Sequence, residues 1–123
     1  MTNHEIGARL VELCRANDTE TGLNELYSAD AVSVEAMAMP GTPSAETRGL
    51  DGIRGKHAWW ENTMEVHSAN VDGPYPHGGD RFGVIFEIDC TNRDTGERSQ
   101  MKEIAIYHVA DGKIVREEFF YSM

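Results

Sequence analysis

Apolar residues recur at helical spacing near the N-terminus of the chain. Two stripes with members three or four positions apart predict a helix over about residues 2–16 and a second, short helix that begins near Asp18 or Thr19. Either side chain can accept a hydrogen bond from a free backbone N–H in the first turn. Since so few residues separate the helices, we expect a helical hairpin. Its inward positions are Ile6, Leu10, Leu13, Cys14, Leu23, Leu26 and Tyr27.

A third helix is predicted over about residues 50–64. It follows a short strand at residues 31–35 and a loop at residues 37–47 that is long enough to form a flap. Asp51 lies in its first turn, where a carboxylate interacts favourably with the helix dipole. The inner stripe of this helix is expected to be Ile53, His57, Trp60 and Met64.

The rest of the chain alternates apolar and polar residues, which predicts strands. They are expected over residues 65–71, 81–91, 99–109 and 114–121, with a Gly- and Pro-rich turn at 72–80 and tighter turns at 94–96 and 111–112. Helices segregated from antiparallel strands indicate an α+β fold, with residues 1–123 as a single domain. We expect three N-terminal helices packed in a strongly curved, mostly antiparallel sheet, a cone that encloses a pocket.

Charge and cysteine content narrow the possible partners. The formal net charge is −10 over 123 residues, and no basic stripe offsets it, so nucleic acid and anionic membrane are not expected partners. No apolar stretch approaches the length of a membrane span, and the N-terminus lacks the pattern of a signal peptide. Cys14 and Cys90 both lie in apolar patterns and are interpreted as reduced core residues. Together these features predict a cytoplasmic protein.

Three segments resemble one known superfamily. Residues 26–35 (LYSADAVSVE), 48–53 (RGLDGI) and 109–115 (VADGKIV) are similar, in this order, to segments of the SnoaL-like and ketosteroid isomerase-like proteins of the nuclear transport factor 2-like superfamily. The resemblance covers nearly the whole chain and implies the cystatin-like cone. It does not imply one activity, because the superfamily holds isomerases, cyclases, dehydratases, binding proteins and assembly modules.

The resemblance places Glu35 where ketosteroid isomerases keep the carboxylate that moves the substrate proton. A base at this position needs a partly apolar pocket that raises its pKa, whereas a glutamate at a strand end is otherwise usually solvated. The oxyanion donors of those enzymes are missing here. Leu10 and Val11 occupy the place of the tyrosine on the first helix. The place of the aspartic acid on the penultimate strand falls near Ala105, with Glu103 two residues earlier on the same face. Ketosteroid isomerase activity is therefore not expected.

Four ionisable residues are predicted to meet in the pocket as catalytic candidates: Glu35, His67, Glu103 and Glu117. Carboxylates and a histidine in a partly dry space raise one another's pKa values, although each could instead be an ordinary strand residue. The histidines fit no metal-ligand spacing, so neither a metal nor a cofactor is expected. Met39 on the 37–47 loop could help to seal an apolar ligand. The predicted ligand-binding residues are Met37, His57, Trp60, Phe82, Phe86, Tyr107, Phe119 and Tyr121.

The face of the sheet that points away from the helices carries apolar residues of its own. Ile104, Ile106 and Phe120, with Phe86 or Ile85, are the candidates, and whichever set faces outward predicts a partner surface. The resemblance implies a homodimer through this face. Three functions stay open: an isomerase, cyclase or lyase acting by proton transfer on an apolar, carbonyl-bearing molecule; a non-catalytic binder of such a small molecule; and an assembly module.

Overall fold

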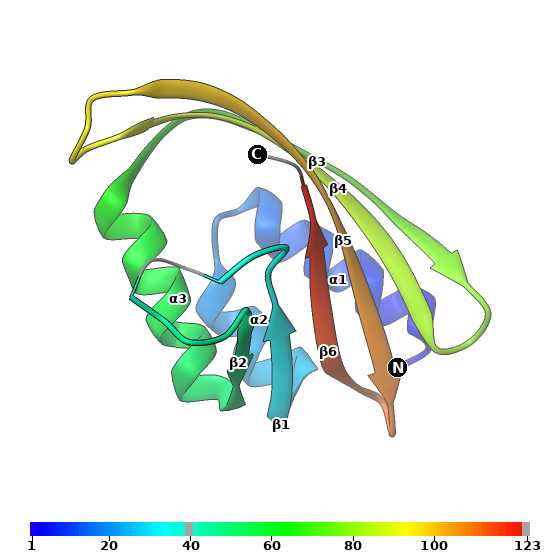
Figure 1. The fold of residues 1–123 in the computed structure, drawn as a ribbon. Helices are drawn as coiled ribbons and strands as arrows, with labels where there is room; N and C mark the ends of the chain where they lie inside the picture. Colours follow the sequence, from blue (N-terminus) through cyan, green and yellow to red (C-terminus); the bar gives the residue numbers. More distant parts are fainter. Residues whose placement is uncertain (39–40, 122–123) are drawn as a thin grey trace.

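The computed structural model describes residues 1–38 and 41–121. The chain forms three helices and six strands. Two strands lie between the second and third helices, and the other four follow the third helix. The sheet curves over the helices (Figure 1). The elements are α1 Asn3–Arg15, α2 Thr19–Leu26, β1 Tyr27–Val34, β2 Glu46–Arg48, α3 Gly49–Thr63, β3 Met64–His77, β4 Arg81–Asn92, β5 Arg98–Ala110 and β6 Lys113–Phe120. The predicted α+β arrangement is confirmed.

Each helix of the α1–α2 hairpin begins at a side-chain cap. The Thr2 hydroxyl accepts a hydrogen bond from the Glu5 N–H, and the Glu5 carboxylate accepts one from the Thr2 N–H, which together form a capping box. Asp18 caps α2 by accepting from the Thr21 N–H at 3.2 Å. Both helices bury the predicted stripes, so periodicity located these helices to within about one residue.

The strand order in the sheet is β2-β1-β6-β5-β4-β3. β1 and β6 are parallel, and every other neighbouring pair is antiparallel. The parallel pair joins the strand that follows α2 to the last strand of the chain. It therefore brings Ser33 of β1 opposite Glu117 of β6.

Three predicted boundaries were wrong. The strand expected at residues 31–35 begins at Tyr27, which therefore belongs to β1 and not to the second helix. The 72–80 segment is not a turn throughout, because β3 continues to His77. A register shift between Asp72 and Tyr75 accommodates the Gly–Pro sequence, and β3 is an edge strand, where proline is tolerated. The predicted loop at 37–47 ends early, since Glu46 and Thr47 belong to β2. The predicted turn at Asp111–Gly112 is confirmed, and both residues have the positive φ that a tight hairpin requires.

The core lies between the helices and the concave face of the sheet. Its members come from all three helices and from β1, β3, β4, β5 and β6. On β4 and β5 the inward residues alternate as predicted, with Val84 opposite Ala105 and Phe82 opposite Tyr107. In the described part of the chain, no helix is long and apolar enough to cross a membrane.

Candidate functional site

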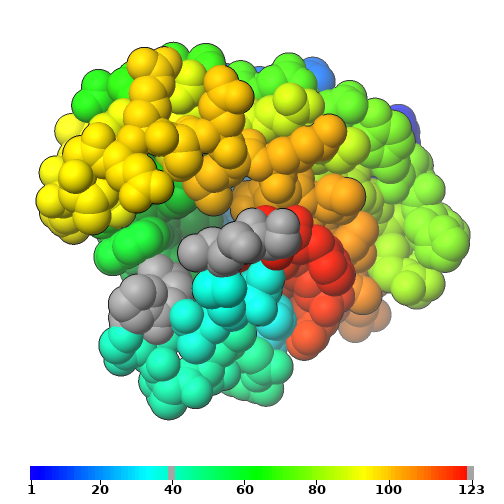
Figure 2. All heavy atoms as spheres, turned by 45° about the horizontal axis from the view of Figure 1, so that its top comes forward, coloured from blue at the N-terminus to red at the C-terminus, as the bar shows by residue number. Residues whose placement is uncertain are grey.

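A cavity of about 460 Å³ opens between the concave face of the sheet and the three helices. On the face drawn in Figure 2, the surface is hollowed between the β4–β5 hairpin and the segment that follows β1. Its walls are largely apolar, and this size suits a small organic molecule. The apolar lining includes Leu10, Leu13, Leu23, Met37, Trp59, Trp60, Met64, Phe86, Ile88, Met101 and Phe119.

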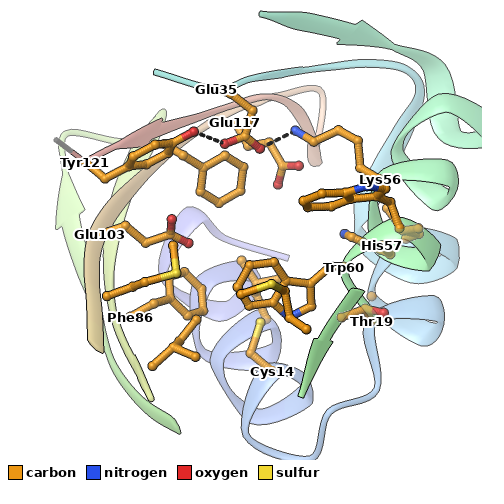
Figure 3. Close-up of a pocket in the computed structure, with 18 of the residues that line it drawn as sticks. Cys14, Thr19, Glu35, Lys56, His57, Trp60, Phe86, Glu103, Glu117 and Tyr121 are labelled. Atoms are coloured by element: carbon orange, nitrogen blue, oxygen red, sulfur yellow. Dashed lines mark hydrogen bonds and ion pairs between the residues drawn. The ribbon is translucent and has the colours of Figure 1, made fainter. Parts of the chain in front are cut away.

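An ion pair lies at the polar end of the cavity. The Lys56 ammonium of α3 is 2.6 Å from Glu35 Oε1 (Figure 3). It also donates a hydrogen bond to Ser33 Oγ at 2.7 Å. Ser33 and Glu35 are two positions apart at the end of β1, so both side chains point to the same face. The Lys56 ammonium also lies 5.4 Å from the centre of the Phe119 ring. Contacts from β1 and β6 therefore hold the Lys56 side chain in place inside a mostly apolar cavity.

Two tyrosines complete the hydrogen bonding of the carboxylates at this end. The Tyr121 hydroxyl donates to Glu35 Oε2 at 3.0 Å, so both Glu35 oxygens are engaged. The Tyr27 hydroxyl donates to Glu117 Oε2 at 2.5 Å. Glu117 is almost completely buried, and burial raises its pKa, while hydrogen bonds from Tyr27 and Ser33 oppose that shift. Glu117 thus lines the cavity as a nearly buried acid that is already hydrogen-bonded to Tyr27 and Ser33.

Glu103 stands apart from this network. It lies on β5 opposite Phe86 and points into the cavity (Figure 3). Burial, together with the negative charges of Glu35 and Glu117, raises its pKa to about 7, and Lys56 acts in the opposite direction. Within residues 1–38 and 41–121 no group hydrogen-bonds or forms an ion pair with its carboxyl group. Glu103 can therefore take up or release a proton near neutral pH.

The structure brings most of the predicted site residues together. Glu35, Glu103 and Glu117 line one cavity, although their catalytic roles stay predictions. His57 also lines the cavity, and its pKa is lowered, mainly by burial and then by Lys56, which favours the neutral imidazole. Met39 lies outside the described residues. Of the predicted ligand-binding residues, the cavity is lined by Met37, His57, Trp60, Phe86, Tyr107, Phe119 and Tyr121.

Two predicted site residues lie elsewhere. His67 Nε2 is 2.7 Å from Thr91 Oγ1, and His67 does not line the cavity. The register of β3 against β4 shifts between Val66 and Ser68. The shift changes the face of the sheet to which the side chain of His67 points. Phe82 is a core residue with no exposed surface, and its ring stacks on Tyr107 with centroids 5.0 Å apart. It lies at the start of β4 beneath α1, too deep in the core to reach a ligand.

The residue that the sequence interpretation missed is Lys56. A weak signal was present, because Lys56 is three positions after the buried Ile53 and four before Trp60, on one side of α3. Lysine on a helix is ordinarily solvated, so periodicity alone assigns it to the surface. Over the described ranges, no group of three or more His, Cys, Asp or Glu residues could hold a metal ion.

The fold agrees with comparisons to known proteins. The model of the SnoaL-like domain matches residues 1–121, and the chain belongs to this family. A Mesorhizobium loti protein named as a candidate SnoaL-like polyketide cyclase and carbohydrate phosphatase shares 38% identity, with a TM-score of 0.90 over 98% of this chain and 100% of the other. None of the curated proteins matches the chain.

More distant structures share the fold alone. A nuclear transport factor 2-like protein from Burkholderia thailandensis is 21% identical, with a TM-score of 0.81 over 99% of this chain and 92% of the other. A Xanthomonas campestris protein with a cystatin-like fold is 19% identical, with a TM-score of 0.76 over 100% and 92%. The predicted family and the cystatin-like α+β cone are confirmed.

Proposed function

We propose that this SnoaL-like protein is an enzyme that moves protons on an apolar, carbonyl-bearing small molecule, as an isomerase, cyclase or lyase does. The observation that carries the proposal is Glu103, an unpaired carboxyl group with a pKa of about 7 that points into an apolar cavity. A general acid–base works best when its pKa is near the working pH. At neutral pH this group is present in both forms.

Glu103 suits the role of base better than Glu35 does. Both oxygens of Glu35 already have partners, Lys56 and Tyr121, whereas the described residues give the Glu103 carboxyl group no hydrogen-bond or ion-pair partner. The earlier expectation for Glu35 becomes a positioning role: it holds the ammonium of Lys56 in the cavity.

Lys56 supplies the electrophilic partner that the missing tyrosine would otherwise provide. An ammonium has three N–H donors, and Ser33 and Glu35 use two of them. The third can donate to a substrate carbonyl. Glu103 would then remove a proton from the adjacent carbon, the electron pair would move to the carbonyl oxygen, and the resulting enolate would be stabilised by Lys56. Return of the proton to another carbon gives isomerisation, and attack of the enolate carbon on a second carbonyl gives cyclisation.

The Mesorhizobium loti relative supports the cyclase form of this chemistry, since it is named as a candidate polyketide cyclase. Cyclisation of a chain of ketones begins with loss of a proton next to a carbonyl, which is the step assigned to Glu103. The relative shares more than a third of its sequence with this chain over its whole length. The substrate itself is not implied by the name.

Deuterium exchange tests the proposal without knowledge of the natural substrate. Apolar ketones with acidic C–H groups, such as 2-tetralone, would be incubated with the protein in D₂O and followed by NMR. We expect catalysed exchange that rises with pH and levels off above about pH 7, the pKa of Glu103. Glu103→Gln should lower the rate at least about 100-fold. Glu87→Gln, an exposed residue on β4, is the matched control.

A non-catalytic binder is the second candidate. The observation in its favour is that Leu10 and Val11 stand where ketosteroid isomerases carry their oxyanion tyrosine. Binding of apolar ketones with no exchange above the background rate in the unmodified protein would support this reading over the enzyme.

We also propose that two copies pair through the outer face of the sheet. Ile85, Ile104 and Phe120 are direct cross-strand partners on β4, β5 and β6, and Ile104 and Phe120 are 44% and 52% exposed. A row of apolar side chains on adjacent strands favours a partner surface.

The free cysteines Cys14 and Cys90 fit a reducing compartment such as the cytoplasm.

A further inference from the structure

The cavity holds a carboxyl group, that of Glu103, with which no described residue forms an ion pair. Ionisable side chains from all three helices and from the sheet line the cavity. They are Asp18 at the α2 cap, Glu35 after β1, Lys56 and His57 on α3, Glu103 and Tyr107 on β5, Glu117 on β6, and Cys14, Tyr27 and Tyr121. The single lysine is paired with Glu35 at 2.6 Å. Asp18 is occupied with capping α2, and Glu117 is closed off behind its bonds to Tyr27 and Ser33.

Several of the side chains that line the cavity are aromatic. Trp60 and Phe86 lie on opposite sides of the cavity in Figure 3, and Trp59, Tyr107, Phe119 and Tyr121 line it as well. The face of an aromatic ring carries partial negative charge and attracts a cation. Aromatic faces and an unpaired carboxylate in one cavity are complementary to a cation attached to an apolar body.

We propose that the cavity binds hydrophobic amines in their protonated form, with Glu103 as the counter-ion and aromatic rings around the apolar body. Lys56 does not oppose this binding strongly, because Glu35 neutralises it. The net charge of −10 attracts cations to the protein at long range. This inference goes beyond the proposed function, since it requires binding and no turnover.

Amine binding should depend on pH in a defined direction. An ammonium favours the ionised form of Glu103, whose pKa in the free protein is about 7. About a tenth of Glu103 is ionised at pH 6 and about nine-tenths at pH 8. Affinity for an amine that stays protonated should therefore rise about tenfold from pH 6 to pH 8, with a proton released on binding. A carboxylate of the same shape should show the opposite trend.

Calorimetric titration of three compounds with one apolar body tests the inference. The probes are 2-naphthylmethylamine, the neutral 2-naphthylmethanol and the anionic 2-naphthoate. At pH 8 we expect the amine to bind at least tenfold more tightly than the alcohol, and 2-naphthoate more weakly than both. Glu103→Gln should reduce the affinity for the amine to that for the alcohol. Its affinity for the alcohol should be unchanged, which also shows that the variant is folded. Glu87→Gln should behave as the unmodified protein does.

Equal binding of amine and alcohol, or a preference for the amine that survives in Glu103→Gln, would overturn the inference, as would failure of all three compounds to bind. The result is separable from the proposed function. Amine selectivity without catalysed deuterium exchange would leave this inference in place and remove the enzyme. Catalysed deuterium exchange without amine selectivity would leave the proposed enzyme in place and remove this inference.

Discussion

Lys56 and Glu35 form an ion pair of 2.6 Å between α3 and the end of β1, with side chains only 14% and 19% exposed. The same ammonium reaches Ser33 and lies over the Phe119 ring. One lysine thus links α3 to the two parallel strands β1 and β6. Because the pair is mostly shielded from water, losing one member leaves a charge that is costly to bury.

Replacing Lys56 with methionine should destabilise the protein by about 2 kcal/mol, since Glu35 would be left as a buried charge with one hydrogen bond from Tyr121. Chemical denaturation at pH 7.5 measures the change. The double variant Lys56→Met/Glu35→Gln removes both charges and should recover at least half of the loss. A double variant as unstable as the sum of the two single variants would contradict the assigned coupling.

Glu103 should make the stability of the protein fall as pH rises. Its folded pKa of about 7 lies above the ordinary value of 4.5, so the folded state binds more protons than the unfolded state between these two values. The contribution of Glu103 to the free energy of unfolding therefore falls from pH 4.5 to 7. Glu103→Gln lacks this loss, and its stability relative to the unmodified protein should increase by about 2 kcal/mol between pH 5 and pH 8.

Denaturation curves at pH 5 and pH 8 for the unmodified protein, Glu103→Gln and Glu87→Gln check this. Glu87 is exposed on β4, opposite Lys102, so its replacement should give nearly the same difference at both pH values. A pH-independent effect of Glu103→Gln would mean that the carboxyl group is solvated and not raised in pKa.

Two glycines in helices should respond oppositely to alanine. A Cβ at Gly7 of α1 would lie 2.7 Å from Pro74 Cβ and 3.2 Å from the Phe82 ring, so Gly7→Ala should destabilise by about 2 kcal/mol. A Cβ at Gly55 of α3 would meet no atom within 4 Å among the described residues, and Gly55→Ala should stabilise by about 0.7 kcal/mol because alanine favours the helix. Thermal unfolding compares the two, and a stabilising Gly7→Ala would contradict the close packing of α1 against β3.

The outer face of the sheet should control the oligomeric state. We expect a dimer by light scattering coupled to gel filtration, and a monomer for Phe120→Glu, because a charge would be buried in the row formed with Ile104 and Ile85. Val66→Glu changes an exposed apolar residue on the edge strand β3, outside this row, and should remain dimeric. An unmodified protein that is monomeric at high concentration would refute the pairing.

Short-range pattern was sufficient to predict most of the fold. Helical spacing placed Ile6, Leu10 and Leu13 inward, and alternation placed Glu103 and Tyr107 on one face of β5, because both patterns follow from local backbone geometry. That this face lines the cavity followed from the family resemblance. The family resemblance added Glu35. The predicted turn at 72–80 was wrong because glycine and proline also occur in an irregular edge strand.

The errors within the site have a different cause. His67 was misplaced by a register shift, which depends on how β3 pairs with β4 and has no local signature. Lys56 was missed because its partners Ser33 and Glu35 are 23 and 21 positions away, and a lysine on a helix is expected in water unless those partners are known. The tyrosine partners of Glu117 and Glu35 are more distant still.

The parallel pairing of β1 with β6 also bears on how the chain reaches its native state. Tyr27 and Glu117 are 90 positions apart, and Glu35 and Tyr121 are 86 apart, so the polar end of the cavity closes a very long loop. Contacts of such large sequence separation slow folding, because the chain loses entropy before the contacts form. We expect the α1–α2 hairpin and the β4–β5 hairpin to form early and the Lys56–Glu35 region to assemble late. Capture of a small molecule would then report completion of folding, which makes ligand binding a kinetic probe of the last step.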